Sequence, residues 1–432
     1  MFQQLNFRVD YNDADYSDLC LPESDKQILR VLAEHVAALS VLPVQDEKRR
    51  LWHAHNMLER TRPVVLCDPE HGWNEIILPE DIECVNSVAR YWEYYLRKVL
   101  FWGERMLDDY VVEAVFDVPL VYTESPWTVR GSRHAPTAKK TAEDGKAYHI
   151  DTVLEDYSQI RNIVKPELTI DWKASDASLE IAREIFEGIL VVRRKTVWFW
   201  SCGLTDDLVF LRGMEKVMLD FFDNPDGLHE IMGILLEGVM ERLDWLESEG
   251  FLWLNNDGSY VGSGGVGFID SLPAAGFAGK VRAKDMWALA ESQAVIGISP
   301  EMFAEFIFPY QKTILERFGF ACYGCCEPMD DRFDIVRQLS NLRRVSVSAW
   351  ANRSLMAEKL GHKYIYSLKP NPALLAQAVM DEELVRKDVR AGLRTARDNC
   401  LELIMKDNHT IGRNPQNVTR WVGIVQEEIA AL

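Results

Sequence analysis

Phe320-Ala321-Cys322-Tyr323-Gly324-Cys325-Cys326-Glu327-Pro328 is a short apolar run that ends in two thiols and a carboxylate. Such a run is typical of a strand buried on both faces, with reactive groups at its carboxyl end. Similar runs occur at residues 196–201, 251–256, 286–291, 344–350, 364–368 and 401–406, and helical patterns separate nearly all of them. This alternation indicates βα units and a parallel sheet.

The first part of the chain adds strand candidates at residues 63–68 and 111–116, after a stretch from about 25 to 60 whose apolar residues recur at helical spacing. Seven later strands and one or two early ones come close to eight. We therefore expect an α/β protein, a (β/α)₈ TIM barrel with a helical N-terminal extension. Residues 1–60 would form the extension and residues 61–432 the barrel. A polar excursion near 130–150 would be exposed or act as a lid.

Local signals support the pattern of elements. Ser299-Pro300 predicts the start of a helix that ends before Gly319, and Asn414-Pro415 predicts the start of the last helix. No GxGxxG or GxxxxGK[ST] phosphate-binding motif follows a strand. The glycine-rich residues 258–267 have the spacing of neither motif, and we expect them to form a mobile active-site loop.

Composition favours an ordinary soluble enzyme, with 47% hydrophobic and 27% charged residues among 432. The formal net charge of −19 argues against nucleic acid or an anionic membrane as the principal partner. There is no apolar run of about 18 residues and no signal-peptide pattern at the start, so we expect a cytoplasmic location. The eight cysteines are scattered, and we expect them to be reduced.

The carboxyl ends of the predicted strands carry polar and aromatic groups. If the strands form a barrel, these groups meet at one rim and form a pocket for a small organic substrate. Each residue alone is more simply read as a cap, a loop carboxylate or core packing, so their joint placement supports the prediction. The predicted substrate-binding residues are Trp198, Trp200, Asn256, Asp257, Glu291, Gln293 and Trp350.

A zinc ion at this rim is the most specific hypothesis, because zinc takes thiolate, imidazole and carboxylate ligands. Alternation along a strand would send Cys325 and Glu327 to one side and Cys326 to the other. We therefore expect Cys325, Glu327 and His409 to be the metal ligands. The cysteine spacing is wrong for a radical-SAM cluster, and a Cys-His nucleophile pair remains open.

Several motifs resemble the uroporphyrinogen decarboxylase superfamily, in its corrinoid-dependent methyltransferase and O-demethylase branch. They are residues 290–293, 297–303, 323–328, 369–372 and 406–410. The resemblance implies a barrel that binds zinc through His-x-Cys and a later cysteine and passes a methyl group to Co(I) of a separate corrinoid protein. Cys325 matches the family cysteine, but Tyr323 replaces the histidine and His409 lies near the later cysteine. Glu327 is a candidate replacement ligand. The arginine-rich motif of the decarboxylases is missing, and Arg62 alone cannot replace it.

The expected function is therefore transfer of a methyl group from a small methylated substrate, with a methoxylated aromatic ring favoured, to a corrinoid protein. Because an alkoxide or phenoxide is a poor leaving group, a metal or an acid must neutralise it, and the candidate catalytic residues are Glu327, Tyr323 and Cys326. A homodimer remains open. The rival hypotheses are a decarboxylase of a small acid, which would use rim arginines such as Arg353 and Arg413, and a non-catalytic barrel that binds a small ligand.

Overall fold

The computed structural model describes residues 15–132, 134–140, 148–195 and 201–432. Its central element is a six-stranded, all-parallel sheet in the order β1-β14-β13-β12-β11-β10. The strands are β1 (Val64–Cys67), β10 (Trp287–Ala290), β11 (Phe320–Tyr323), β12 (Leu342–Val347), β13 (Ile365–Leu368) and β14 (Cys400–Met405). The predicted α/β class and parallel sheet are confirmed, and the last strand pairs with the first.

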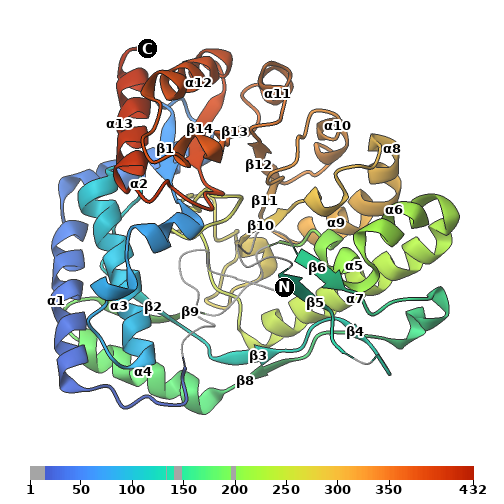
Figure 1. The fold of residues 1–432 in the computed structure, drawn as a ribbon, viewed down its shortest axis with the longest axis horizontal. Helices are drawn as coiled ribbons and strands as arrows, with labels where there is room; N and C mark the ends of the chain where they lie inside the picture. Colours follow the sequence, from blue (N-terminus) through green and yellow to red (C-terminus); the bar gives the residue numbers. More distant parts are fainter. Residues whose placement is uncertain (1–14, 133, 141–147, 196–200) are drawn as a thin grey trace.

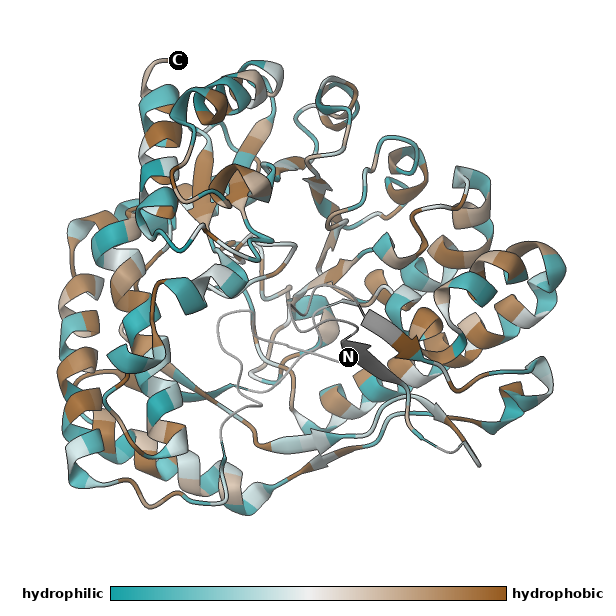
Figure 2. Cartoon of the chain, in the orientation of Figure 1, coloured by the Kyte–Doolittle hydropathy of each residue, from teal (hydrophilic) through white to brown (hydrophobic). Residues whose placement is uncertain are grey.

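Helices surround the arc of strands (Figure 1), and several of them are apolar on one side and polar on the other (Figure 2). Helix α9 packs on β10, α11 on β13 and α13 on β1. The α-helices are α1 (Glu23–Ser40), α2 (Pro43–Asn56), α3 (Ser87–Phe101), α4 (Trp172–Phe186), α5 (Thr205–Arg212), α6 (Met214–Asp223), α7 (Pro225–Glu249), α8 (Pro300–Met302), α9 (Phe308–Leu315), α10 (Phe333–Val336), α11 (Arg353–Leu360), α12 (Glu382–Thr395) and α13 (Gln416–Ala430).

The predicted helix boundaries are confirmed at two places. The Ser299 hydroxyl accepts a hydrogen bond from the amide of Met302 at the start of α8, and the Asn414 side chain accepts one from the amide of Gln416 at the start of α13. Within the described ranges, no single helix is long and apolar enough to cross a membrane, although the bent pair α1 and α2, at 67°, meets the length and composition criteria together.

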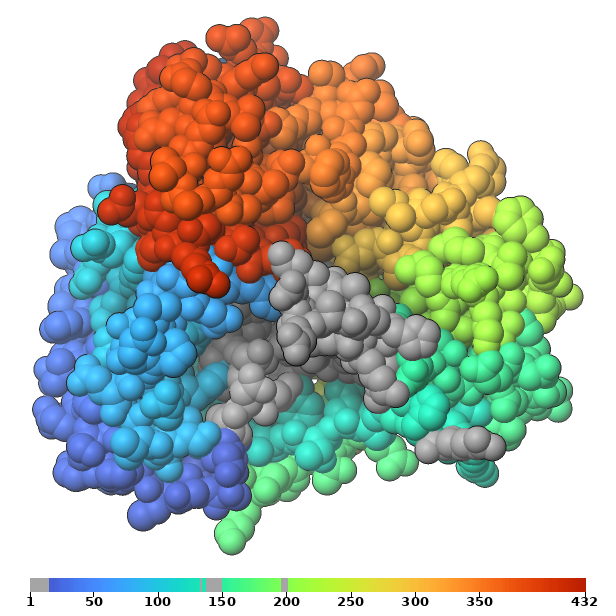
Figure 3. All heavy atoms as spheres, viewed as in Figure 1, coloured from blue at the N-terminus to red at the C-terminus, as the bar shows by residue number. Residues whose placement is uncertain are grey.

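A second parallel ladder joins β2 (Val115–Pro119) to β9 (Val191–Lys195). Two backbone hydrogen bonds connect the flanks of this pair to the large sheet. The Asp109 amide donates to the Val65 carbonyl in β1 at 2.9 Å, and the Cys202 amide donates to the Leu289 carbonyl in β10 at 2.7 Å. On the face seen in Figure 3 the colours follow one another around the molecule, with the red C-terminal part beside the blue N-terminal part. Closure of all these strands into one barrel stays a prediction.

The predicted polar excursion corresponds to a long antiparallel arm between β2 and α4 (Figure 1). Three short ladders build it: β3 with β8, β4 with β7, and β5 with β6. Their bounds are β3 (Tyr122–Glu124), β4 (Thr128–Val129), β5 (Thr137–Lys140), β6 (Tyr148–Asp151), β7 (Ile163–Val164) and β8 (Leu168–Ile170).

The strand predicted at residues 251–256 is wrong. This segment joins no ladder; instead the Asn255 side chain donates to the backbone carbonyl of Trp287 at 3.0 Å and accepts from its amide at 2.9 Å. The side chain thus takes the place of a backbone partner at the start of β10. Of the strand predicted at 196–201, residues 196–200 lie outside the described residues.

Residues 255–268, which we call the interior hairpin, pack against side chains of the sheet, because Gly262, Gly264 and Gly265 lie close to Cys322, Ile404 and Arg344. An antiparallel bridge between Tyr260 and Val266 closes the hairpin, and the Val261 amide donates to the Gly265 carbonyl at 3.0 Å. All residues from 261 to 269 are buried. The predicted loop is therefore buried, because its glycines allow the backbone to pack inside the protein, and its mobility stays a prediction.

Alternation along the strands decides which side chains meet this hairpin. In β12, Val345 and Val347 join the main apolar core, whereas Arg344 and Ser346 alternate with them. A Cβ atom at Gly265 would lie 2.4 Å from Cζ of Arg344, and one at Gly267 would lie 1.7 Å from the backbone oxygen of Asn255. Only a residue without a side chain allows these approaches.

We predict that Gly267→Ala destabilises the protein by at least about 2 kcal/mol, because the methyl group must displace backbone rather than a flexible side chain. Gly297→Ala is the matched control, since nothing lies within 4 Å of its Cβ position. Urea denaturation of both variants measures the difference. Equal midpoints for the two variants would contradict the packing of the interior hairpin.

Buried charges lie at the base of the hairpin. Glu402 in β14 accepts from Nε of Arg344 at 2.9 Å, and His55 Nε2 lies 3.0 Å from the same carboxylate. Burial alone would lower the pKa of His55, but the Cys400 sulfur and the Glu402 carboxylate raise it, to about 9. Burial tends to raise the pKa of Glu402, yet Arg344 and His55 hold it well below its usual value.

These shifts predict how stability depends on pH. The contribution of His55 to the free energy of unfolding is complete below its unfolded pKa of about 6.5. It is lost as the pH rises through the folded-state pKa of about 9. The contribution of Glu402 is present above its unfolded pKa and is lost as the pH falls. Loss of the His55 charge should lower the free energy of unfolding, measured with urea, by up to about 3 kcal/mol between pH 6 and pH 10. In His55→Gln this alkaline loss should shrink; an unchanged alkaline slope would contradict the charged His55–Glu402 pair.

Candidate functional site

Two cysteines, a lysine and two oxygen-bearing side chains meet beyond the carboxyl ends of β11 and β14. Gly324, with φ of +90°, turns the chain after β11 and is followed by Cys325 and Cys326. The two Sγ atoms are 3.5 Å apart. At Cys325 Sγ, the hydroxyl of Ser263 from the tip of the interior hairpin donates at 3.2 Å and Nζ of Lys406 lies at 3.8 Å. We call Ser263, Cys325, Cys326, Lys406 and Asp407 the thiol cluster.

The groups around this cluster shift the pKa values of the two thiols in opposite directions. The hydrogen bond from Cys326 lowers the pKa of Cys325 and Lys406 lowers it further, to about 7, although burial opposes both effects. The same bond and burial raise the pKa of Cys326 far above its usual value. Asp407 Oδ2, at 3.3 Å, is a second acceptor for the single S–H proton of Cys326. Lys406 also lies 2.8 Å from Asp407 and 3.4 Å from Glu70. The pKa shifts therefore favour the thiolate form of Cys325 and the thiol form of Cys326.

Two carboxylates lie next to the thiol cluster, and each has a different set of partners. Glu327 accepts from the amides of Ser292 and Cys325, both at 2.9 Å. Glu291, at the end of β10, accepts from the Ser201 hydroxyl at 3.1 Å and from the Gln293 amide at 2.9 Å. Burial raises the pKa of Glu291 well above its usual value, and the nearby charges of Asp206 and Glu327 add to the rise. These effects shift Glu291 toward its protonated form.

The predicted zinc ligands are not brought together. His409 is exposed and stacks on the ring of His71, with centroids 5.5 Å apart, while Cys325 is 3% exposed inside the rim. Both oxygens of Glu327 accept backbone hydrogen bonds. Among the described residues no group of three or more His, Cys, Asp and Glu side chains could hold a metal ion. The trio Cys325, Glu327 and His409 therefore does not fit zinc in this structure.

The other predicted site residues are dispersed. Trp198 and Trp200 lie outside the described residues. Trp350, three residues after β12, is 71% exposed, and the Asn256 side chain donates to the Leu272 carbonyl. The Tyr323 hydroxyl is buried and donates to Gln311 of α9 at 2.5 Å, so its proton is already engaged.

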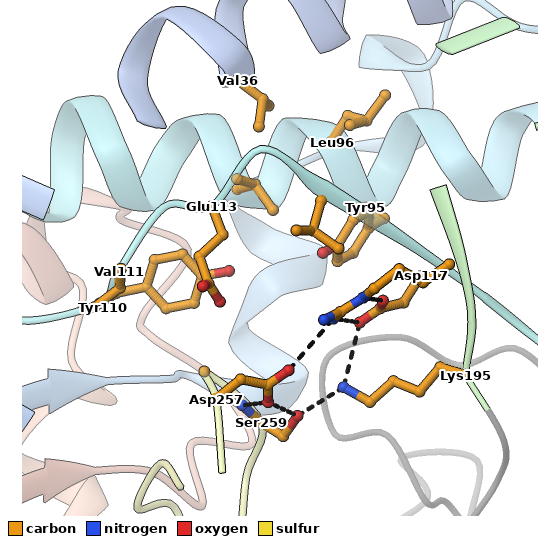
Figure 4. A pocket seen from close by; sticks show the side chains of 14 residues that line it. Val36, Tyr95, Leu96, Tyr110, Val111, Glu113, Asp117, Lys195, Asp257 and Ser259 are labelled. Atoms are coloured by element: carbon orange, nitrogen blue, oxygen red, sulfur yellow. Dashed lines mark hydrogen bonds and ion pairs between the residues drawn. The ribbon is translucent and has the colours of Figure 1, made fainter. Parts of the chain in front are cut away.

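Asp257 belongs to a separate ion cluster at the ends of β2 and β9 (Figure 4). Arg193 donates to Asp117 at 2.7 Å and to Asp257 at 3.3 Å, while Lys195 donates to Ser259 at 2.6 Å. Burial opposes ionisation of Asp257, but Lys195 and the Ser259 hydroxyl lower its pKa to about 2. The cavity beside these residues holds about 30 Å³. This is far below the several hundred Å³ of a typical small-molecule site.

Sequence reasoning missed the residues that set the state of Cys325. Ser263 lies in the stretch that the sequence analysis interprets as a mobile loop. Glu70 comes three residues after β1 and belongs to no recognisable motif. Lys406 and Asp407 were visible as a lysine and an acid at a strand end, and a lysine opposite a strand-end cysteine is the signal that could have identified them.

Comparison with known proteins gives little further guidance. No protein-family model and no curated protein matches the chain. Among solved structures, the chain is similar to a methyltransferase from Methanosarcina mazei, with 11% sequence identity, 88% of this chain and 97% of that chain covered, and a TM-score of 0.47. A likeness this distant assigns neither an activity nor a residue role to the chain.

We predict that Cys325 is alkylated with a midpoint near pH 7, because Cys326 and Lys406 stabilise its thiolate. In Cys326→Ala the midpoint should rise by roughly one pH unit toward that of a free thiol. The measurement is the rate of iodoacetamide labelling at Cys325, mapped by peptide mass spectrometry. Cys202→Ala, which removes a buried thiol just before α5 and outside the thiol cluster, is the control. An unchanged midpoint in Cys326→Ala would remove Cys326 as the cause.

Proposed function

We propose that the protein is a methyltransferase that moves a methyl group from a small methoxylated aromatic substrate to the Co(I) of a separate corrinoid protein. We further propose that β1, β2, β9 and β10 to β14 form one ring of eight parallel strands, a (β/α)₈ barrel. The two linking hydrogen bonds at Asp109 and Cys202 support this ring. On this model the thiol cluster, Glu291 and Glu327 share the carboxyl-end rim, where barrel enzymes place their active sites.

The buried carboxyl group of Glu291, held by Ser201 and the Gln293 amide just beyond β10, is the observation that carries the proposal. Cleavage of a methyl ether leaves an alkoxide or phenoxide, which is a poor leaving group unless it gains a proton as the bond breaks. A buried carboxyl group whose pKa is raised favours its protonated form and can supply that proton. Glu291 therefore replaces Glu327 and Tyr323 as our general acid. The Co(I) of the partner supplies the nucleophile and accepts the methyl group.

After burial and Asp206, Glu327 is a further cause of the raised pKa of Glu291. Glu327 is held by two backbone amides beside Glu291, and its charge helps to raise the pKa of Glu291. Ser201 donates to Oε1 of Glu291 and fixes the orientation of the carboxyl group. Because the predicted zinc ligands do not converge, we assign no step to a metal.

Decarboxylation of a small acid has less support from the described residues. Cationic side chains free to grip a carboxylate would favour it, but Arg353 pairs with Asp388 at 2.8 Å on the outer helices. Lys406 is occupied by Asp407 and Glu70. The predicted aromatic walls at Trp198 and Trp200 remain part of the proposal for the methyl donor.

The experiment supplies reduced free cobalamin in place of the corrinoid protein, together with a series of methoxylated arenes, and follows the loss of Co(I) absorbance. We expect wild-type protein to methylate cobalamin and Glu291→Gln to be slower by about 10² or more with unactivated ethers. The loss should shrink for ethers of acidic nitrophenols, whose leaving groups need less protonation.

The control is Glu358→Gln, which changes an exposed carboxylate on α11 in the same way. Equal losses across the whole leaving-group series would show that Glu291 does not act as the acid. If wild-type protein methylates cobalamin from none of the donors, methyl transfer from methoxylated arenes is wrong.

A further inference from the structure

Cys325 and Cys326 have the arrangement of a paired oxidation site. Their Sγ atoms are 3.5 Å apart in the reduced protein. One sulfur lies beside the Lys406 ammonium, and the other lies 3.3 Å from Asp407 Oδ2. A thiolate and a neighbouring thiol that can react with its oxidised form are what a reversible sulfur switch requires.

The two cysteines differ in their exposure to solvent. Cys325 is 3% exposed, whereas Cys326 is half-buried. A reagent of about the size of water can reach the sulfurs more easily than a bulky one. The Ser263 hydroxyl, held at 3.2 Å by the buried interior hairpin, keeps Cys325 Sγ in place beside Cys326.

We propose that Cys325 and Cys326 are a peroxide-sensitive modification site that closes into a disulfide between neighbouring residues. The Cys325 thiolate attacks one oxygen of hydrogen peroxide and the O–O bond breaks. Hydroxide is the leaving group, and Cys325 becomes a sulfenic acid. The Cys326 sulfur then attacks the sulfenic sulfur, the S–O bond breaks, and the hydroxyl group leaves with the Cys326 proton as water. Two thiols are oxidised, and one peroxide is reduced to two waters.

The bond formed should be easy to reverse. Consecutive Cα atoms are about 3.8 Å apart, which is shorter than the roughly 4.4 to 6.8 Å that disulfides prefer. Strained disulfides have more oxidising potentials and are the labile, regulatory ones. A small thiol would therefore restore both cysteines. This inference stands apart from methyl transfer, because its readout is the mass of the protein and not its activity.

The test uses full-length protein with Cys20→Ser, which removes the exposed cysteine. After treatment with dilute hydrogen peroxide and blocking of free thiols, peptide mass spectrometry should show a loss of two hydrogen atoms within the peptide that contains Cys325 and Cys326. Dithiothreitol should restore both thiols to alkylation. With Cys326→Ala in addition, the reaction should stop at a sulfenic acid on Cys325 that dimedone traps.

Lys406→Met should slow the oxidation about tenfold, because the thiolate loses its neighbouring cation. The matched control is Lys312→Met, which removes a half-buried lysine paired with Glu316 and should leave the rate unchanged. The proposal is overturned if peroxide leaves Cys325 and Cys326 reduced while other cysteines react, or if wild-type Cys325 proceeds to sulfinic acid without linking to Cys326.

Discussion

The close contact between the interior hairpin and the parallel sheet is the constraint on which the rest of the structure depends. Gly265 lies against the Arg344 guanidinium, and a Cβ at this position would be 2.4 Å from Cζ. The same hairpin carries Ser263 to the sulfur of Cys325. A glycine-poor hairpin could not approach the sheet closely enough, and the thiol cluster would lose one of its hydrogen-bond donors.

Arg344 connects the hairpin to the charges beneath it. Its guanidinium donates to Glu402 and to the side chain of Asn56 at 2.7 Å, and Glu402 in turn holds His55. Buried ions of this kind are costly to bring out of water, but removing one partner costs more, because it leaves an unpaired charge in the interior. The network therefore specifies how the hairpin, the sheet and α2 fit together, and α2 belongs to the folded core.

The sequence predicted those parts of the fold that follow from local apolar runs, including β1 and β10 to β14. It failed at residues 251–256, where the Asn255 side chain bonds to Trp287 in place of a backbone ladder. Single-sequence patterns do not reveal such a long-range side-chain partner. Cys325, Glu291 and Glu327 were placed correctly beyond strand ends, because carboxyl ends of parallel strands gather at one edge.

His409 was placed wrongly for a reason that the pattern could not show. Asp407, with φ of 60°, turns the chain after β14, and Glu75 then accepts hydrogen bonds from the amides of Ile411 at 2.9 Å and Arg413 at 2.7 Å. These contacts carry His409 to the surface beside His71. The same turn brings the Asp407 carboxylate within hydrogen-bond distance of Cys326 Sγ. One turn thus directs His409 away from the rim and places Asp407 in the thiol cluster.

Hydrogen exchange of the backbone amides of residues 261–268 tests most directly whether a packed hairpin supports the reactive rim. The account predicts that these amides exchange as slowly as those of the flanking strands β10 and β11, because the hairpin opens only when the sheet itself unfolds. Exchange as fast as that of exposed surface loops would contradict the account, since a hairpin that opens freely could not hold Ser263 on Cys325.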